Sequence, residues 1–189
     1  MSTLKLIPSS GGGSVSLVPP SSTSGADVNI TLPTTSRGFG KIIQVVSTLK
    51  NDTFTTTSTT YTDITGLSVN IQPTSTASKV LVSFNVDASN TTNHSCRVGI
   101  FKGEANLLGS SEGNRLRGWQ LYIYNDMNTS GRHSFQILDS PSSDQTLTYK
   151  VKMAVQAGTG TVNRSGADLD NALYGYRSAS SITVMEVAA

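Results

Sequence analysis

The sequence predicts an all-β protein, a jelly-roll-like antiparallel β-sandwich head over residues 41–189 preceded by an extended N-terminal arm over residues 1–40. Several segments place apolar residues at every second position, which is typical of half-buried strands. No window of ten or more residues carries apolar positions at the i, i+3, i+4, i+7 spacing of a helix. Clusters of turn-forming residues separate the segments at short intervals, as in sandwiches and small barrels.

Residues 1–40 combine three consecutive glycines, a Pro-Pro pair and Ser/Thr clusters with short apolar pieces, LKLI, VSLV and VNITL. Such a segment does not bury enough apolar surface for a core of its own. The apolar pieces alternate with polar residues, as expected of an extended arm whose side chains dock into another protein or against copies of itself. We therefore predict an arm that orders on assembly, with a flexible N-terminus as the alternative.

Three segments of the head show the alternation most clearly. GLSVNIQP (66–73), SKVLVSFNVDAS (78–89) and TYKVKMAVQAG (148–158) each place apolar residues on one face and polar residues on the other. The further strand candidates are GKIIQVVSTL (40–49), CRVGIFKG (96–103), ANLLGSS (105–111), GWQLYIYN (118–125), RHSFQILDS (132–140) and SSITVMEVAA (180–189). Turns are expected at FKGEAN (101–106), SPSSD (140–144) and AGTGT (157–161).

The stretch TFTTTSTTYTDITG (53–66) is rich in Thr and Ser and reads as either a linker or part of a sheet. Thr is β-branched and suits a partly exposed strand, and the stretch runs directly into the alternating segment that follows. A linker of this composition is expected to contain Pro or Gly, and here the first glycine is Gly66. We interpret the stretch as strand, turn and the start of a second strand.

Composition excludes several classes of partner. Charged residues make up 14% of the chain and the net charge is +2, without any run of basic residues, so neither nucleic acid nor an anionic membrane is expected as a partner. The single cysteine, Cys96, has no internal disulfide partner. No apolar run approaches the length of a membrane helix and no signal peptide is recognised, so we expect a soluble chain without membrane insertion.

The scarcity of charge also bears on assembly. Strand edges that lack charged residues are poorly protected against pairing with another chain, and a symmetric homo-oligomer would cover them. We therefore expect the chain to associate with itself, while the pattern of residues does not choose between a dimer and a trimer.

Two segments resemble a module of tail-fibre and other virion structural proteins of tailed bacteriophages, particularly those of marine bacteria and cyanobacteria. They run from GKIIQ to VDAS (40–89) and from YKVKM to EVAA (149–189), whereas residues 90–135 show no such match. The resemblance implies a β-sandwich head, a homotrimer, and a place in the virion after assembly in the host cytoplasm. In fibres this module looks like the receptor-facing end of a long shaft, and nearly all of a shaft is missing here.

Catalytic and metal-binding patterns are sparse. The two histidines, His94 and His133, occur in unrelated contexts without a recognisable nucleophile motif, and a pairing of Cys96 with His94 is more simply read as incidental. No metal motif is present, so neither a metal nor a cofactor is expected. Asp168 and Asp170 hint at a calcium loop but lack the remaining ligand positions, and a solvated turn is the simpler interpretation.

Glycan cleavage requires two carboxylates that flank the sugar. The candidates are Asp168 and Asp170 together with Asp126, Asp139 or Glu112, and nothing in their spacing singles out a pair.

Binding is better supported than catalysis. In a strand over GWQLYIYN, Trp119, Leu121 and Ile123 share one face, which we expect to join the core. Tyr122 and Tyr124 lie on the other face, where two tyrosines suit either a subunit interface or stacking on a sugar. Arg115 and Arg117 precede this strand and are candidates for contacting anionic sugars.

The predicted function is a non-enzymatic virion structural protein, a tail fibre or fibre-like head. Residues 1–40 would attach it to other virion proteins, and a host-surface glycan is a candidate ligand of the head. The alternatives are a capsid decoration or cement protein, a polysaccharide-degrading tailspike, and a soluble cell-encoded lectin.

Overall fold

A computed structural model describes residues 4–6, 15–17, 42–92, 94–122, 128–173 and 175–188. The chain divides into two units, residues 1–39 and 40–189. In the first unit, β1 (Leu4–Leu6) and β2 (Val15–Leu17) pair antiparallel. Two of the three apolar pieces are thus strands that pair with each other, and the third, VNITL, lies outside the described residues.

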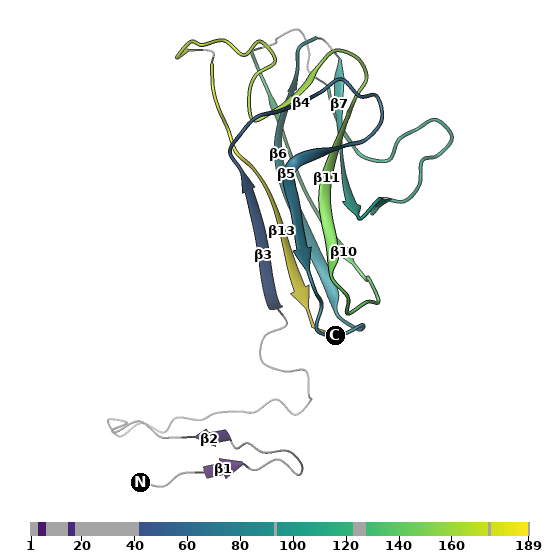
Figure 1. Cartoon of the computed structure of the whole chain (residues 1–189), viewed down its shortest axis with the longest axis vertical. Coiled ribbons are helices and arrows are strands. Elements are labelled where there is room, and N and C mark those ends of the chain that lie inside the picture. The colour runs from purple at the N-terminus through teal and green to yellow at the C-terminus, as the bar shows by residue number, and fades with distance from the viewer. Residues whose placement is uncertain are drawn as a thin grey trace. The chain divides into compact units, whose positions relative to one another are not determined.

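The described part of the second unit, which we call the head, consists of strands and loops without a helix (Figure 1). Its strands are β3 (Ile42–Lys50), β4 (Phe54–Thr56), β5 (Thr62–Ile71), β6 (Lys79–Asn90), β7 (Ser95–Lys102), β8 (Ala105–Asn106), β9 (Trp119–Tyr122), β10 (Gly131–Asp139), β11 (Leu147–Val155), β12 (Gly160–Val162) and β13 (Ser180–Val187). No helix in the described residues has the length and hydropathy of a membrane span.

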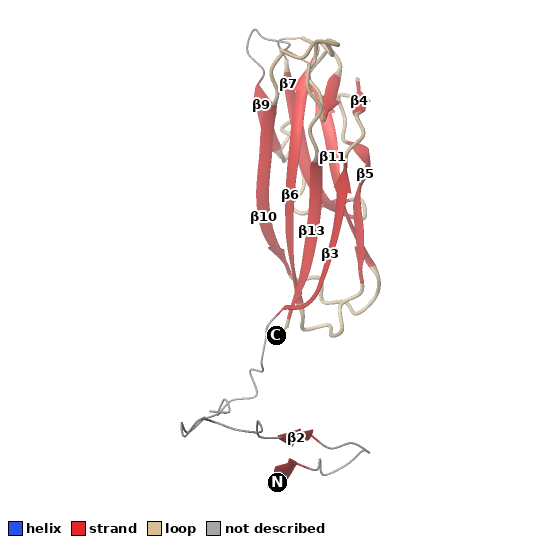
Figure 2. Ribbon diagram, turned by 90° about the vertical axis from the view of Figure 1, so that its left-hand side faces the viewer, coloured by secondary structure: helices blue, strands red, loops and turns tan. Residues whose placement is uncertain are grey.

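The six-stranded sheet is built around the long strand β6. One edge of β6 pairs with β10, and the other edge pairs with β13 along its first half and with β12 at its end. Strands β13 and β12 pair in turn with β3 and β4. The sheet is therefore four strands wide, in the order β10, β6, β13/β12 and β3/β4. Figure 2 shows β10, β6, β13 and β3 side by side.

The five-stranded sheet follows the same plan. Its order is β5, β11 and β7, and the free edge of β7 pairs with β9 and then with the short β8. The pairs β3 and β4, β8 and β9, and β12 and β13 each count as one interrupted strand. Numbered along the head in this way, the first, eighth, third and sixth strands form one sheet, and the second, seventh, fourth and fifth form the other. This is the connectivity of a jelly roll, so the predicted fold class is confirmed.

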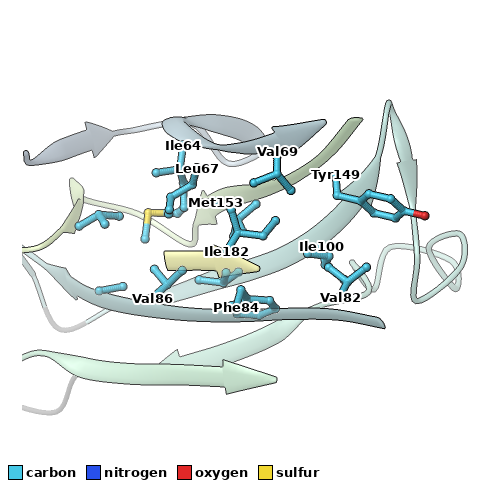
Figure 3. Packing of buried hydrophobic residues seen from close by; sticks show 14 of the residues in the cluster. Ile64, Leu67, Val69, Val82, Phe84, Val86, Ile100, Tyr149, Met153 and Ile182 are labelled. Carbon is cyan, nitrogen blue, oxygen red and sulfur yellow. The ribbon is translucent and has the colours of Figure 1, made fainter. Parts of the chain in front are cut away.

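The core lies between the two sheets and follows the alternation in the sequence (Figure 3). In β5, Leu67, Val69 and Ile71 are at most 4% exposed, while the residues between them face solvent. Strand β6 alternates in the same way as far as Val86, as predicted, whereas its residues 87–90 and residues 151–155 of β11 are all buried.

The Thr-rich stretch is confirmed as part of the sheets. Phe54–Thr56 is strand β4, which pairs with β12, and β5 begins at Thr62. Residues 57–61 connect them, with the hydroxyl of Ser58 donating to the carbonyl of Thr60 at 2.7 Å. Side chains of the same chemical type thus serve a strand and a turn in succession.

Two local predictions were wrong. The segment ANLLGSS forms a strand only over Ala105–Asn106, because the side chain of Asn106 accepts the N–H of Leu108 at 2.9 Å and turns the chain. Strand β12 lies partly within AGTGT, which was predicted as a turn. Gly160 is needed there for close approach, since a Cβ at this position would lie 2.5 Å from Val155 and 3.0 Å from Met153.

Candidate functional site

The candidate site is a cleft on the outer side of the five-stranded sheet, where the loop between β7 and β9 folds back over the sheet. The cleft has a volume of about 400 Å³. It is lined by Tyr61, Phe101, Glu104, Ala105, Asn106, Gly109, Ser110 and Ser111.

Two aromatic rings form the floor of the cleft. Tyr61 and Phe101 pack edge to face, with ring centroids 5.1 Å apart. Glycines make room for them, because a Cβ at Gly99 would lie 2.9 Å from Phe101 and 3.1 Å from Tyr61, and a Cβ at Gly118 would overlap the Tyr61 hydroxyl. Sequence reasoning missed this pair, since the two residues are forty positions apart and neither belongs to a motif.

The loop is held over the cleft through one carbonyl oxygen. The Tyr61 hydroxyl and the side-chain amide of Asn106 each donate a 2.8 Å hydrogen bond to the carbonyl of Arg117. Burial raises the pKa of Tyr61 to about 12, so its hydroxyl remains protonated and donating over the physiological range. Further along the loop, Glu112 and Arg115 exchange two backbone hydrogen bonds of 3.1 Å.

The predicted arginines lie in this loop. Arg115 is exposed, and Arg117 is exposed with its guanidinium 3.0 Å from the carboxylate of Glu112. This ion pair is 49% and 67% exposed, so solvent screens it and an anionic ligand competes for the guanidinium at low cost.

The predicted tyrosines are described only in part. Tyr122 is the last residue of β9, opposite Ser95, and its side chain and the whole of Tyr124 lie outside the described part of the chain. Tyr122 is five residues beyond Arg117, which in an extended strand corresponds to about 16 Å. The backbone therefore places the arginines and Tyr122 toward opposite ends of β9.

The other face of β9 behaves as predicted at its described positions. Trp119 packs against the core, with its ring centroid 5.2 Å from that of Phe84 and 4.0 Å from that of Phe135, while Gln120 is exposed. These aromatic contacts connect β9 in one sheet with β6 and β10 in the other.

A network of four charged side chains borders the cleft. Lys150 bonds Asp63 at 2.9 Å and Glu104 at 2.6 Å, and Lys152 reaches the same two carboxylates while lying 4.9 Å from the ring centroid of Phe101. Hydrogen bonds from Lys150 and then Lys152 lower the pKa of Glu104. The carboxylate of Glu104 therefore stays ionised at neutral pH. The paired charges give this side of the head a mixed, largely neutralised charge.

The candidate nucleophile is inaccessible. Cys96 is 0% exposed, its thiol donates to the carbonyl of Ser89 at 3.0 Å, and the amide of Asn90 approaches the sulfur at 3.7 Å. Burial raises the pKa of Cys96 to about 11, which the Asn90 contact only partly offsets. The ring of His94 is bonded to the hydroxyl of Thr92 at 3.0 Å.

Two of the remaining catalytic candidates, Asp139 and Glu112, have structural partners. Asp139 accepts hydrogen bonds from Tyr149 at 2.6 Å and from Lys102 at 2.9 Å, which join β10 to β11 and β7. Glu112 is paired with Arg117, as described above. His133 lies in β10, where burial lowers its pKa. Asp126 lies outside the described residues.

The hinted calcium loop contains an ion pair in place of a metal site. Asp168 lies 2.8 Å from Arg177 and 3.4 Å from Arg164, and Asp170 is exposed. Among the described residues, no group of three or more His, Cys, Asp or Glu is placed to hold a metal ion.

No family model matches the chain, and no curated protein matches its sequence. Solved structures that it resembles come from infectious bursal disease virus. They are the T13 viral particle (15% identity, TM-score 0.42, 93% of this chain and 42% of that chain) and the derived T=1 particles (16%, 0.39, 97% and 44%). A third is the Gt strain (15%, 0.39, 97% and 47%). The chain spans less than half the length of these proteins, and at these TM-scores the likeness carries no inference about its role.

Proposed function

We propose that the chain is a non-enzymatic virion structural protein, a tail fibre or fibre-like head that is attached to the particle through residues 1–40. One observation supports this most directly. The two segments that resemble tail-fibre head modules, residues 40–89 and 149–189, supply β3 to β6 and most of β11 together with β12 and β13. These include three of the four central strands of the jelly roll.

The segment without resemblance has a different place in the head. Residues 90–135 supply β7 to β9, the start of β10 and the loop that covers the cleft. A shared scaffold with an individual surface loop is the arrangement expected of proteins that attach to different surfaces. The cleft, with its aromatic floor and the nearby Arg117, has the chemistry to bind an acidic host-surface glycan.

The test is to locate the chain in the purified particle by labelling its C-terminus and imaging by electron microscopy. Label at the tail is the expected result. Label spread over the shell would favour the second candidate, a capsid decoration protein, and particles without label would refute a virion role.

A polysaccharide-degrading spike is distinguished by chemistry. Release of reducing sugar from host surface polysaccharide by the purified protein would overturn the non-enzymatic assignment. Glycan contact at the cleft predicts that Arg117→Ala lowers adsorption to host cells, while Arg164→Ala, which removes an arginine outside the cleft, leaves adsorption unchanged.

A further inference from the structure

The outer face of the six-stranded sheet has an unusual composition. Its four strands, β10, β6, β13 and β3, align their outward residues in cross-strand rows. Three consecutive rows contain no charged side chain: Leu138–Leu81–Met185–Val45, then Gln136–Ser83–Thr183–Ser47, then Ser134–Asn85–Ser181–Leu49. We call these twelve residues the uncharged face.

One row of the uncharged face is entirely apolar and partly open to solvent. Val45 is 56% exposed and Leu138 is 49% exposed, although both lie in regular strands. Leu49, at the end of the third row, is 62% exposed. Contiguous apolar residues on a folded surface commonly mark a site of association.

The rest of the uncharged face is hollowed, and the hollow is lined by polar residues together with Phe84 and Phe135. A depression of about 490 Å³ lies over β6, β10 and β13, beside the apolar row. The hydroxyls of Ser47 and Thr183 lie 2.8 Å apart and satisfy each other, so covering this pair does not leave a hydrogen-bonding group without a partner. A raised apolar row beside a polar depression is a surface shape that allows complementary packing against another surface.

The outer face of the five-stranded sheet differs from this surface. It carries Asp63, Lys150 and Lys152, which are joined in the ion-pair network with Glu104. Interface centres are depleted in charged residues, whereas a solvated face tolerates them. The two outer faces of the head are therefore not equivalent, and the uncharged face is the one better suited to packing against another chain.

We propose that the uncharged face is the surface through which copies of this chain pack against one another around a common axis. A second copy is the favoured occupant because two uncharged faces meet without like-charge repulsion and without leaving a buried charge unpaired. A symmetric arrangement also brings the same apolar row of each copy toward the axis. The inference concerns assembly of the chain alone and does not depend on the virion role.

The position of the chain ends fits this packing. Ile42, where β3 begins, pairs with Val187 at the end of β13, next to the apolar row. Copies that meet through this face hold the first residues of their heads near the axis. The arms of all copies then start close together, which raises their effective concentration at a shared attachment point.

The experiment measures the mass of the purified full-length protein by sedimentation equilibrium, for wild type and for Val45→Lys, Leu138→Lys and Leu173→Lys. Wild type is expected at a multiple of 19.9 kDa, with the trimer as the proposed state. Val45→Lys and Leu138→Lys place like charges together near the axis and should lower the mass to that of one chain. Leu173→Lys is the matched control, since Leu173 is 83% exposed and lies outside the uncharged face.

Circular dichroism and urea unfolding establish that each variant is folded. Retention of the wild-type mass by both Val45→Lys and Leu138→Lys would overturn the proposal, because association would then use another surface. A wild-type protein that stays monomeric at every concentration would overturn it as well. If Leu173→Lys also sedimented with a mass lower than wild type, added charge would weaken association regardless of its position. That outcome would equally count against this face.

Discussion

Glu186 accepts both the backbone N–H and the hydroxyl of Thr74 through one carboxylate oxygen, each at 2.7 Å. Its other oxygen accepts the side-chain amide of Gln44 at 2.7 Å. Glu186 is 0% exposed on the inward side of β13. The buried carboxylate thus fixes the loop between β5 and β6 against β3 and β13.

This carboxylate makes stability depend on acid. Burial alone raises the pKa of Glu186, but the hydrogen bonds from Gln44, Thr74 and Ser78 outweigh it and lower the pKa to about 2, from 4.5. Because the folded pKa is the lower one, the stabilisation is fully present above pH 4.5 and is lost as pH falls toward 2. The shift corresponds to stabilisation on the order of 3 kcal/mol.

The measurement is the free energy of unfolding in urea, from pH 7 to pH 2, for wild type and Glu186→Gln. The variant should be less stable at pH 7 by roughly 1–3 kcal/mol, because an amide cannot accept all four hydrogen bonds. The difference should shrink toward pH 2. Glu112→Gln is the control, since the Glu112 carboxylate is exposed. If the difference in unfolding free energy between Glu186→Gln and wild type did not change with pH, the assignment would be contradicted.

The loop over the cleft depends on two donors to one carbonyl. Tyr61→Phe and Asn106→Ala each leave the carbonyl of Arg117 with one hydrogen bond. Tyr61→Phe should cost about 1 kcal/mol, and Asn106→Ala should cost more because it also removes the acceptor of the Leu108 N–H. The double variant leaves the carbonyl without either donor and should cost more than the sum. A double-mutant cycle of unfolding free energies tests this. If the two single losses add up to the loss of the double variant, the two hydrogen bonds stabilise the loop independently and the prediction is wrong.

The thiol of Cys96 should be inert in the folded protein. Its burial and its raised pKa of about 11 keep it protonated and out of reach of reagents. Titration with a thiol reagent at pH 8 should give no reaction in native protein and one equivalent in urea. Rapid reaction of the native protein would show that the core opens at β7.

Core truncation should separate buried from exposed leucines. Leu67 is 0% exposed between the sheets, so Leu67→Ala should lower the free energy of unfolding by about 2–5 kcal/mol. Leu173→Ala removes the same atoms from an 83% exposed position and should change it by less than about 0.5 kcal/mol. Comparable losses in urea unfolding would place Leu67 outside the packed core.

The strand predictions succeeded where one face of a strand is buried and the other is exposed, because apolar residues then occupy every second position of the sequence. Val80 and Val82 in β6 are buried while Lys79, Leu81 and Ser83 beside them are less so, and this alternation is visible in the sequence. The two failures have different causes. ANLLGSS ends early as a strand because the side chain of Asn106 turns the chain locally. Gly160 belongs to a strand because it pairs with Thr56 of β4 and Asn90 of β6, and no local pattern reveals such long-range pairing.

The site could be predicted only in part for the same reason. Arg115 and Arg117 are recognisable as loop charges from the sequence, and the structure places them at the loop that covers the cleft. The role of Tyr61 depends on a hydrogen bond to a carbonyl 56 residues away. The predicted Tyr122–Tyr124 pair stays a prediction, since its side chains lie outside the described residues.

The sequence by itself determined the all-β class, the identity of the main core strands and the low charge of the surface, because these depend on period-two burial and on composition. Only the tertiary structure decided which strands are neighbours, and therefore that Val45, Leu81, Leu138 and Met185 form one row on one face. Those residues come from four strands separated by as many as 140 positions, and cross-strand pairing alone brings them together. Long-range register is set by the packing of the whole sandwich, so the cleft and the uncharged face exist only once the chain has folded.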